Sequence, residues 1–250
     1  MMKPFTRSLN PEPHTIWAVI PAAGIGSRMQ ADVPKQYLTI RGRSILARSI
    51  DSLHAVSAIT GVVLVGEPSQ WPDDVSDALN GKPWMTTVGG VERCHSVLNG
   101  LRYLSEQLDD PAQLSVLVHD AARPCVRVDD ILRLIDAVGD QADGGILGVP
   151  VSDTLKQSAQ AGNDKKIIGK TIDRSVLWQA QTPQFFKLVL LADALEAALQ
   201  QDKQVTDEAS AMELAGYHPQ LVEGHADNIK ITRPEDLAMA EFFLQQQGRL

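Results

Sequence analysis

The feature that most constrains this chain is a regular alternation of short apolar runs with amphipathic segments. The first run, residues 16–20, is β-branched and short enough to be a buried strand of a parallel sheet. Further strands are predicted at residues 59–65, 84–88, 114–118 and 145–149, and helices at residues 44–53, 91–104 and 130–138. Such an alternation is typical of an α/β protein with a doubly wound, mostly parallel sheet.

The loops that follow these strands are the first candidates for a ligand site. In a doubly wound sheet, ligands bind outside the carboxyl ends of the strands. The predicted strands place Gly24, Gly89 and Asp120 at those ends. We therefore expect three loops from separate parts of the sequence to meet at one crevice.

The alternation stops after residue 150. Residues 151–173 hold two polar extended segments around a turn-like stretch, residues 161–164, which predicts a β-hairpin arm. An isolated hairpin is marginally stable in water, so we expect the arm to pack on another subunit. Beyond it the sequence predicts helices at residues 188–200 and 207–215, short strands at 219–222 and 228–231, and a final helix that opens with a capping box at 232–235.

Residues 1–14 have no periodicity, and their prolines break any regular structure, which predicts a disordered leader before a single domain at residues 15–250. The leader has no apolar core of the kind a signal peptide needs, and no run approaches the roughly 20 apolar residues of a membrane span. The two cysteines, Cys94 and Cys125, fit neither a disulfide framework nor a metal spacing. We therefore expect a soluble, cytoplasmic protein.

The loop after the first strand predicts a polyphosphate site. With 23 basic and 31 acidic residues the chain has a net charge of −8, so nucleic acid and anionic membranes are not expected partners. Residues 21–26 are mostly small, which lets backbone N–H groups approach a ligand, and the cations Arg28 and Lys35 follow closely. By itself the pair Gly24 and Gly26 is a weak motif, because short glycine turns are common and nearby cations are often simply solvated.

Two better-known phosphate motifs are excluded for this loop. A P-loop requires Gly-Lys-Ser/Thr, whereas Gly26 is followed by Ser27 and Arg28. The dinucleotide fingerprint requires a third glycine where Met29 stands, and an acidic residue at the end of the second strand, where none is evident. Another class of phosphate chemistry is therefore indicated.

A series of segments identifies that class. In order, the segments are PAAGIGSRM, PKQY, HDAARP, SDTLK, TIDR, QTPQFF, TDEAS and NIKIT. At these spacings the chain resembles the 2-C-methyl-D-erythritol 4-phosphate cytidylyltransferases of the non-mevalonate isoprenoid pathway, from about residue 16 to residue 243. The glycine loop with its cations is shared by many nucleotidyltransferases, whereas HDAARP, TDEAS and NIKIT together are far more specific to this family. The resemblance implies a Rossmann-like sheet with a dimerising arm.

The activity that this resemblance implies is transfer of CMP from CTP to 2-C-methyl-D-erythritol 4-phosphate, with release of pyrophosphate. A phosphate nucleophile is largely ionised at pH 7, so the step depends on positioning and charge neutralisation and requires no general base. Arg28 and Lys35 match residues that stabilise the transition state. Arg174 and Lys230 match residues that hold the acceptor phosphate. Local sequence alone would read the last two as ordinary surface charges.

The resemblance also implies substrate contacts and a metal. Expected contacts are made by Ala22, Ala23, Gly24, Gly26, Gly90, Ser96, Asp120, Arg123, Thr154, Thr182 and Thr206. Asp120 and Asp227 are the expected carboxylates near Mg²⁺ or another divalent cation, although a strand-end aspartate often only caps a turn. His95 and Val91 stand where relatives often carry acids, so their side chains are not expected to read the base.

The arm and two rival functions complete the expectations. In the family the arm reaches across a homodimer, so Arg174 and Thr154 are expected to serve the partner subunit's site. One rival is a ribitol-phosphate or other polyol-phosphate cytidylyltransferase, which shares most of these motifs. The other is a nucleotide sensor that has the fold without the chemistry, and the four cations argue against it.

Overall fold

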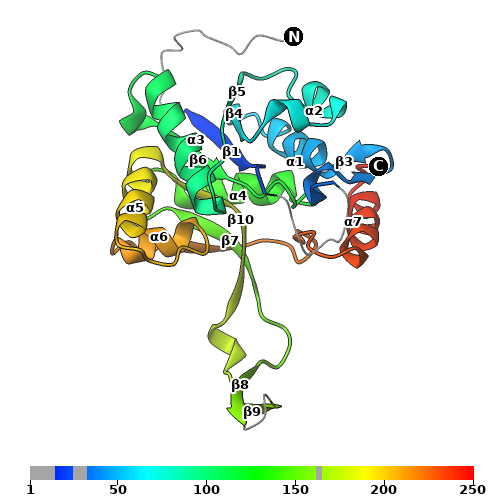
Figure 1. Ribbon diagram of the computed structural model, residues 1–250, viewed down its shortest axis with the longest axis vertical. Helices are drawn as coiled ribbons and strands as arrows, with labels where there is room; N and C mark the ends of the chain where they lie inside the picture. Colours follow the sequence, from blue (N-terminus) through cyan, green and yellow to red (C-terminus); the bar gives the residue numbers. More distant parts are fainter. Residues whose placement is uncertain (1–14, 25–32, 162–164) are drawn as a thin grey trace.

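A seven-stranded sheet forms the centre of the computed structural model, which describes residues 15–24, 33–161 and 165–250 (Figure 1). Its order is β11-β7-β10-β6-β1-β4-β5. The strands are β1 (Ile16–Pro21), β4 (Ile59–Val65), β5 (Trp84–Thr87), β6 (Ser115–Val118), β7 (Gly145–Pro150), β10 (Trp178–Lys187) and β11 (Gln220–Glu223). β10 pairs antiparallel with both neighbours, and the other neighbouring strands pair in parallel. The predicted doubly wound, mostly parallel sheet is confirmed, but β10 was not predicted from the sequence.

The alternation of side chains along β1 explains why helices cover both faces of the sheet. Ala18 and Ile20 point into one apolar cluster, whereas Trp17 and Val19 point into another. The first cluster includes residues of α1 (Ile45–His54), α2 (Asp73–Ala78) and α4 (Val128–Val138). The second includes residues of α3 (Arg93–Gln107), α5 (Leu188–Gln200) and α6 (Glu208–Leu214). α7 (Glu235–Gln246) packs in a third, smaller cluster with Ile45 and Ile231.

Short elements connect these layers. A two-stranded ladder of β2 (Thr39–Ile40) and β3 (Arg43–Ser44) precedes α1. The Ser44 side chain accepts a hydrogen bond from the amide of Ala47 and so caps that helix. Within the described ranges, 3-10 turns lie at Lys35–Tyr37, Pro68–Gln70, Pro111–Gln113 and Arg174–Val176. Among the described residues, the helices are each too short or too polar to cross a bilayer.

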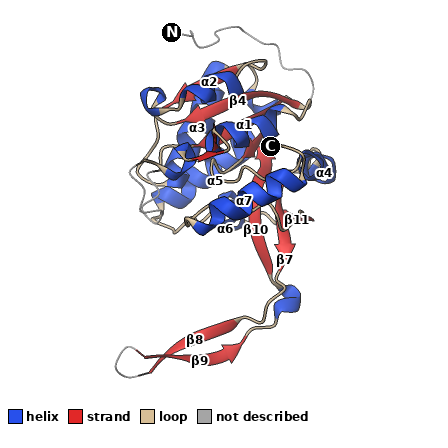
Figure 2. Ribbon diagram, turned by 90° about the vertical axis from the view of Figure 1, so that its right-hand side faces the viewer, coloured by secondary structure: helices blue, strands red, loops and turns tan. Residues whose placement is uncertain are grey.

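The predicted hairpin is present as an arm that projects far from the sheet (Figure 2). Its strands, β8 (Lys156–Ala161) and β9 (Lys165–Thr171), pair with one another in a separate ladder. β7 and β10 lead from the sheet toward the arm, and Trp178 pairs with Pro150 at the last rung of that ladder. The arm therefore continues from two strands of the central sheet.

Two local predictions at the C-terminal end are wrong. Residues 228–231 form no strand, because their polar groups bond to neighbouring loops, as the amide of Ile231 does to the carbonyl of Ala122. The capping box at residues 232–235 is also absent. Instead the carboxylate of Asp236 accepts hydrogen bonds from the amides of Thr232 and Arg233, at 2.7 and 2.8 Å. The leader lies outside the described residues.

Gly144, just before β7, carries a strong requirement for glycine. Its φ is +71°, and a Cβ there would lie 2.1 Å from Cδ1 of Phe186. Replacing Gly144 by alanine is expected to lower the free energy of unfolding by about 3 kcal/mol, because it combines left-handed strain with overpacking. Gly216 has φ +89° with open space around it, so Gly216→Ala should cost only about 1 kcal/mol. Urea denaturation of both variants measures the difference, and equal losses would contradict the crowding argument.

Candidate active site

A cavity of about 250 Å³ lies at the carboxyl ends of the central strands. The loop after β1, the segment between β5 and α3, and the loop after β6 all line it, as the predicted meeting of three loops requires. Of the predicted site residues, those that line the cavity are Ala22, Ala23, Gly24, Lys35, Gly90, Ser96, Asp120 and Lys230. Gly26 and Arg28 lie outside the described residues.

Gln36 holds the described part of the first loop in place. Its side-chain amide donates to the carbonyl oxygens of Ala22 and Gly24, at 2.7 and 2.8 Å, and the residue is 3% exposed. Next to it, the ammonium group of Lys35 donates to the carbonyl of Ile231 at 3.0 Å. The loop after β1 is therefore tied to the segment that carries Lys230. Gln36 stands within the PKQY segment, but no role was predicted for it from the sequence.

The segment between β5 and α3 is built on close backbone packing. A Cβ on Gly89 would lie 2.2 Å from the Cβ of Ala23, and one on Gly90 would lie 2.3 Å from the Cβ of His95. The hydroxyl of Ser96 accepts a hydrogen bond from the amide of Gly90 at 3.0 Å. These contacts fix the cavity wall at Gly90, and a larger residue there would displace it.

Asp120 is the anionic centre of the site. It is 6% exposed, and its carboxylate meets the guanidinium of Arg93 at 2.8 Å, the ammonium of Lys230 at 2.8 Å and the guanidinium of Arg123 at 3.4 Å. Burial alone would raise the pKa of Asp120, but the charges of Arg93, Lys230 and Arg123 lower that pKa well below its ordinary value. Asp120 is therefore ionised near neutral pH, and it positions the cations around it.

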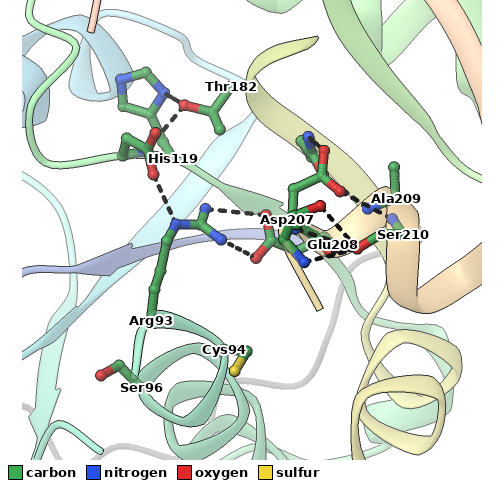
Figure 3. Close-up of polar contacts among 12 residues, drawn as sticks. Arg93, Cys94, Ser96, His119, Thr182, Asp207, Glu208, Ala209 and Ser210 are labelled. Atoms are coloured by element: carbon green, nitrogen blue, oxygen red, sulfur yellow. Dashed lines mark hydrogen bonds and ion pairs between the residues drawn. The ribbon is translucent and has the colours of Figure 1, made fainter. Parts of the chain in front are cut away.

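Arg93 links this centre to α6, a role that was not predicted from the sequence. Its guanidinium donates to both carboxylate oxygens of Glu208, at 2.6 and 3.0 Å (Figure 3). Its Nε donates to Asp120. Burial alone would lower the pKa of Arg93, but the charges of Glu208 and Asp120 raise it above the ordinary value. Glu208, in the TDEAS segment, is buried and therefore needs a cationic partner, but its burial is visible only in the structure, so nothing in the sequence signalled this pair.

His119 and Thr182 support the loop that carries Asp120. The hydroxyl of Thr182 accepts from the amide of Asp120 at 3.0 Å, which leaves its own proton to donate to Nδ1 of His119 at 3.1 Å. A carbonyl oxygen can only accept, so Nε2 of His119 carries a proton and donates to the carbonyl of Arg123 at 3.1 Å. Burial lowers the pKa of His119 to about 4. Thr182, predicted as a substrate contact, thus acts here through the loop.

The low pKa of His119 makes folding acid-sensitive. The unfolded histidine, with a pKa near 6.5, binds a proton more readily than the folded one, so stability present above pH 6.5 is lost as the pH falls toward 4. Between pH 7 and pH 5 this group should remove about 2 kcal/mol of the free energy of unfolding. His119→Gln should be less stable at pH 7 but lose about 2 kcal/mol less over that interval. Urea denaturation at both pH values tests this, and parallel losses in the two proteins would contradict it.

The remaining predicted contacts do not line the cavity; they are Arg123, Thr206, Thr154 and Arg174. Arg123 adjoins it through Asp120 and also donates to the carbonyl of Asn228 at 2.7 Å. Thr206 is exposed beside the first turn of α6, where Asp207, and not Thr206, is the cap. Thr154 and Arg174 are exposed on the arm, where Arg174 donates to the carbonyl of Ser152. One subunit therefore does not bring these two arm residues to its own cavity.

The two carboxylates expected near a divalent cation differ in their surroundings. Asp120 lines the cavity, but Arg93, Arg123 and Lys230 already contact its oxygens, so it suits a cation held mainly by phosphates and water better than direct ligation. Asp227 is not among the described residues that line the cavity. Its Oδ2 accepts from Arg127 at 2.5 Å and from Gln247 at 3.0 Å, which ties the loop to α4 and α7. Its Oδ1 is buried and has no hydrogen-bond partner among the described residues, so the metal role of Asp227 stays a prediction.

Comparison with known proteins places this arrangement in one family. The family model described as IspD, 2-C-methyl-D-erythritol 4-phosphate cytidylyltransferase, matches residues 16–246. An enzyme of that name from Photobacterium profundum is 49% identical over 230 residues, covering 92% of this chain and 96% of its own. One from Vibrio parahaemolyticus is 50% identical over 231 residues, covering 92% and 95%. The crystal structure of the Francisella tularensis enzyme of that name is 33% identical with a TM-score of 0.75, covering 92% of this chain and 100% of its own.

Proposed function

The chain belongs to the 2-C-methyl-D-erythritol 4-phosphate cytidylyltransferase family, and on this premise we propose which of its residues carry the transfer. It is a nucleotidyltransferase that moves CMP from CTP to 2-C-methyl-D-erythritol 4-phosphate in isoprenoid precursor biosynthesis. An oxygen of the acceptor phosphate attacks the α-phosphorus of CTP, and the bond to the leaving pyrophosphate breaks. The products are 4-diphosphocytidyl-2-C-methyl-D-erythritol and pyrophosphate.

The observation that carries the residue assignment is that Lys35 and Lys230 both line the cavity in a chain of net charge −8. Two phosphate esters repel one another, so fixed cations at their meeting point lower the barrier. Lys35, with Arg28, is assigned to the triphosphate and the charge that develops at the α-phosphorus. Lys230, held by Asp120, is assigned to the acceptor phosphate.

The other predicted contacts take supporting roles in this proposal. The small cavity-lining residues Ala22, Ala23 and Gly24 are assigned to the nucleotide, together with the predicted contact Gly26, and Gly90 and Ser96 are assigned to the base. Arg123, Thr182 and Thr206 are assigned to the acceptor side, where Thr182 acts through the loop that carries Asp120. Mg²⁺ or another divalent cation, bound mainly through CTP phosphates near Asp120, would offset further negative charge. Unpaired thiols at Cys94 and Cys125 support a cytoplasmic location.

A homodimer formed through the arm would bring Thr154 and Arg174 to the partner subunit's cavity. Ile167, Ile168 and Val176 are exposed on the arm by 46%, 67% and 74%, an apolar surface that a partner would cover. The β8–β9 ladder has no third strand among the described residues. Contacts across a dimer would give this small ladder the support that it lacks alone.

Complementation tests the shared site. We expect Lys230→Ala and Arg174→Ala each to be nearly inactive, and a heterodimer of the two to regain up to half of wild-type pyrophosphate release, because one of its two sites is intact. A verified heterodimer without recovery would argue against sharing. In the same assay, a preference for ribitol phosphate would favour the rival substrate, and no pyrophosphate release despite CTP binding would favour a sensor.

A further inference from the structure

Three metal-ligating side chains gather at the start of α3, outside the network around Asp120. Cys94 Sγ lies 3.7 Å from Glu92 Oε2 and 3.7 Å from His95 Nδ1. The three potential ligand atoms all lie within 4.8 Å of one another. We propose that Glu92, Cys94 and His95 form a Zn²⁺ site at the rim of the nucleotide cavity, and that the bound ion hinders CTP binding.

The distances fit zinc. With a zinc–sulfur bond of about 2.3 Å and zinc–nitrogen or zinc–oxygen bonds of about 2.0–2.2 Å, a tetrahedral site separates sulfur from its neighbours by roughly 3.5 Å. The two separations from sulfur, 3.7 Å each, are close to that value. The carboxylate oxygen of Glu92 and Nδ1 of His95 lie within 4.8 Å and must approach to about 3.4 Å, which rotation of the exposed Glu92 side chain allows. A thiolate, an imidazole and a carboxylate suit Zn²⁺, whereas Mg²⁺ prefers oxygen ligands only. Mg²⁺ is therefore not expected to compete for this site.

The charges near the site also permit a cation. The Glu92 carboxylate takes part in none of the ion pairs found among the described residues, so it is available as a ligand. The charge of neighbouring Arg93 is offset by the carboxylates of Asp120 and Glu208. A thiolate and a carboxylate together neutralise Zn²⁺, so the complex carries no net charge at the positive end of the helix.

The position of the site relates it to the nucleotide, and this part of the inference rests on the proposed function. Glu92 lines the cavity, and His95 packs directly on Gly90. Three protein ligands leave the fourth zinc position for water. An ion with its water at this wall would narrow a cavity of only about 250 Å³ and hold the Gly90 segment in place. We therefore expect zinc to raise the KM for CTP.

Binding is tested without either substrate. Co²⁺ added to the reduced protein with excess Mg²⁺ should give one equivalent of thiolate-to-cobalt charge-transfer absorption, which Zn²⁺ then displaces. Cys94→Ser should abolish the band and His95→Gln should weaken Zn²⁺ binding at least tenfold. Cys125→Ser is the matched control, because Cys125 is also buried but lies under α7, and it should keep the band. An equal band in the wild type and Cys94→Ser, or no band in the wild type, would overturn the site.

Its effect on the nucleotide is measured separately. One equivalent of Zn²⁺ should raise the KM for CTP at least threefold in the wild type and in Cys125→Ser but not in Cys94→Ser. If zinc binds at Cys94 and the KM for CTP does not change, the proposal that zinc hinders CTP binding is wrong. An inactive protein that still gives the cobalt band would refute the proposed function and leave the metal site standing.

Discussion

Replacing Lys230 by methionine is expected to lower kcat/KM for pyrophosphate release at least a hundredfold, the usual effect of removing one preorganised group that stabilises transition-state charge. Methionine keeps much of the length of lysine without its charge. Lys230 lines the cavity and lies 2.8 Å from Asp120, so its ammonium is already placed before the acceptor phosphate arrives. The loss should appear in kcat as well as in KM, because the interaction strengthens as charge develops.

Lys187→Met is the matched control for this experiment. Lys187 is also paired with an aspartate, Asp140, at 2.7 Å, but it lies at the far end of β10 and does not line the cavity. We expect its kcat/KM to stay within a factor of two of the wild type. If Lys230→Met kept more than a third of wild-type activity while folding normally, Lys230 would have no catalytic role.

Replacing Asp120 by asparagine is expected to lower the free energy of unfolding by about 3–5 kcal/mol, the cost of removing one partner from a buried ion pair. The side chain is 6% exposed, and the change leaves Arg93, Arg123 and Lys230 close together without their shared counter-charge. Activity of the folded fraction should also fall, because Lys230 loses the group that positions it. Urea denaturation and pyrophosphate release measure the two effects.

A double variant separates charge repulsion from a general loss of packing. If the excess positive charge causes the destabilisation, Asp120→Asn with Lys230→Met should be less destabilised than the sum of the two single variants. Asp140→Asn, which breaks the exposed pair with Lys187, should cost less than about 1 kcal/mol. If the losses of unfolding free energy in the two single variants simply add in the double variant, charge repulsion is not the cause of the destabilisation.

The sequence was most informative where a residue's neighbours along the chain decide its structure. The mainly apolar run at residues 59–65 predicted both ends of β4 correctly, because a buried parallel strand needs a nearly continuous apolar run. The loops with Gly24, Gly89 and Asp120 were predicted to meet, because a parallel sheet brings the carboxyl ends of its strands together, and all three loops line the cavity. Recognition of the family supplied Lys230, which local sequence would have read as a surface charge.

The sequence was least informative where contacts between residues far apart along the chain determine the local structure. β10 runs antiparallel to its neighbours β6 and β7 in the sheet. Its segment contains glutamines, a threonine and a proline, and it lacks the continuous apolar run of the neighbouring strands. The pairing of Arg93 with Glu208 joins residues 115 positions apart, and no local pattern specifies it. Residues 228–231 have strand-like composition, but their backbone bonds go to loops. Each of these features depends on tertiary contacts.

The join between arm and body has a consequence for how such enzymes diversify. The amide of Val151 donates to the carbonyl of Leu177 at 3.0 Å, just beyond the last pair of the β7–β10 ladder. The segment between these two residues is therefore an insert that leaves the sheet and returns to it at the same place. Such an insert can lengthen, shorten or be exchanged by recombination while the ladder beneath it stays whole. The insert also contains Arg174, so under the proposed function any change that moves this residue would alter the acceptor site together with the arm.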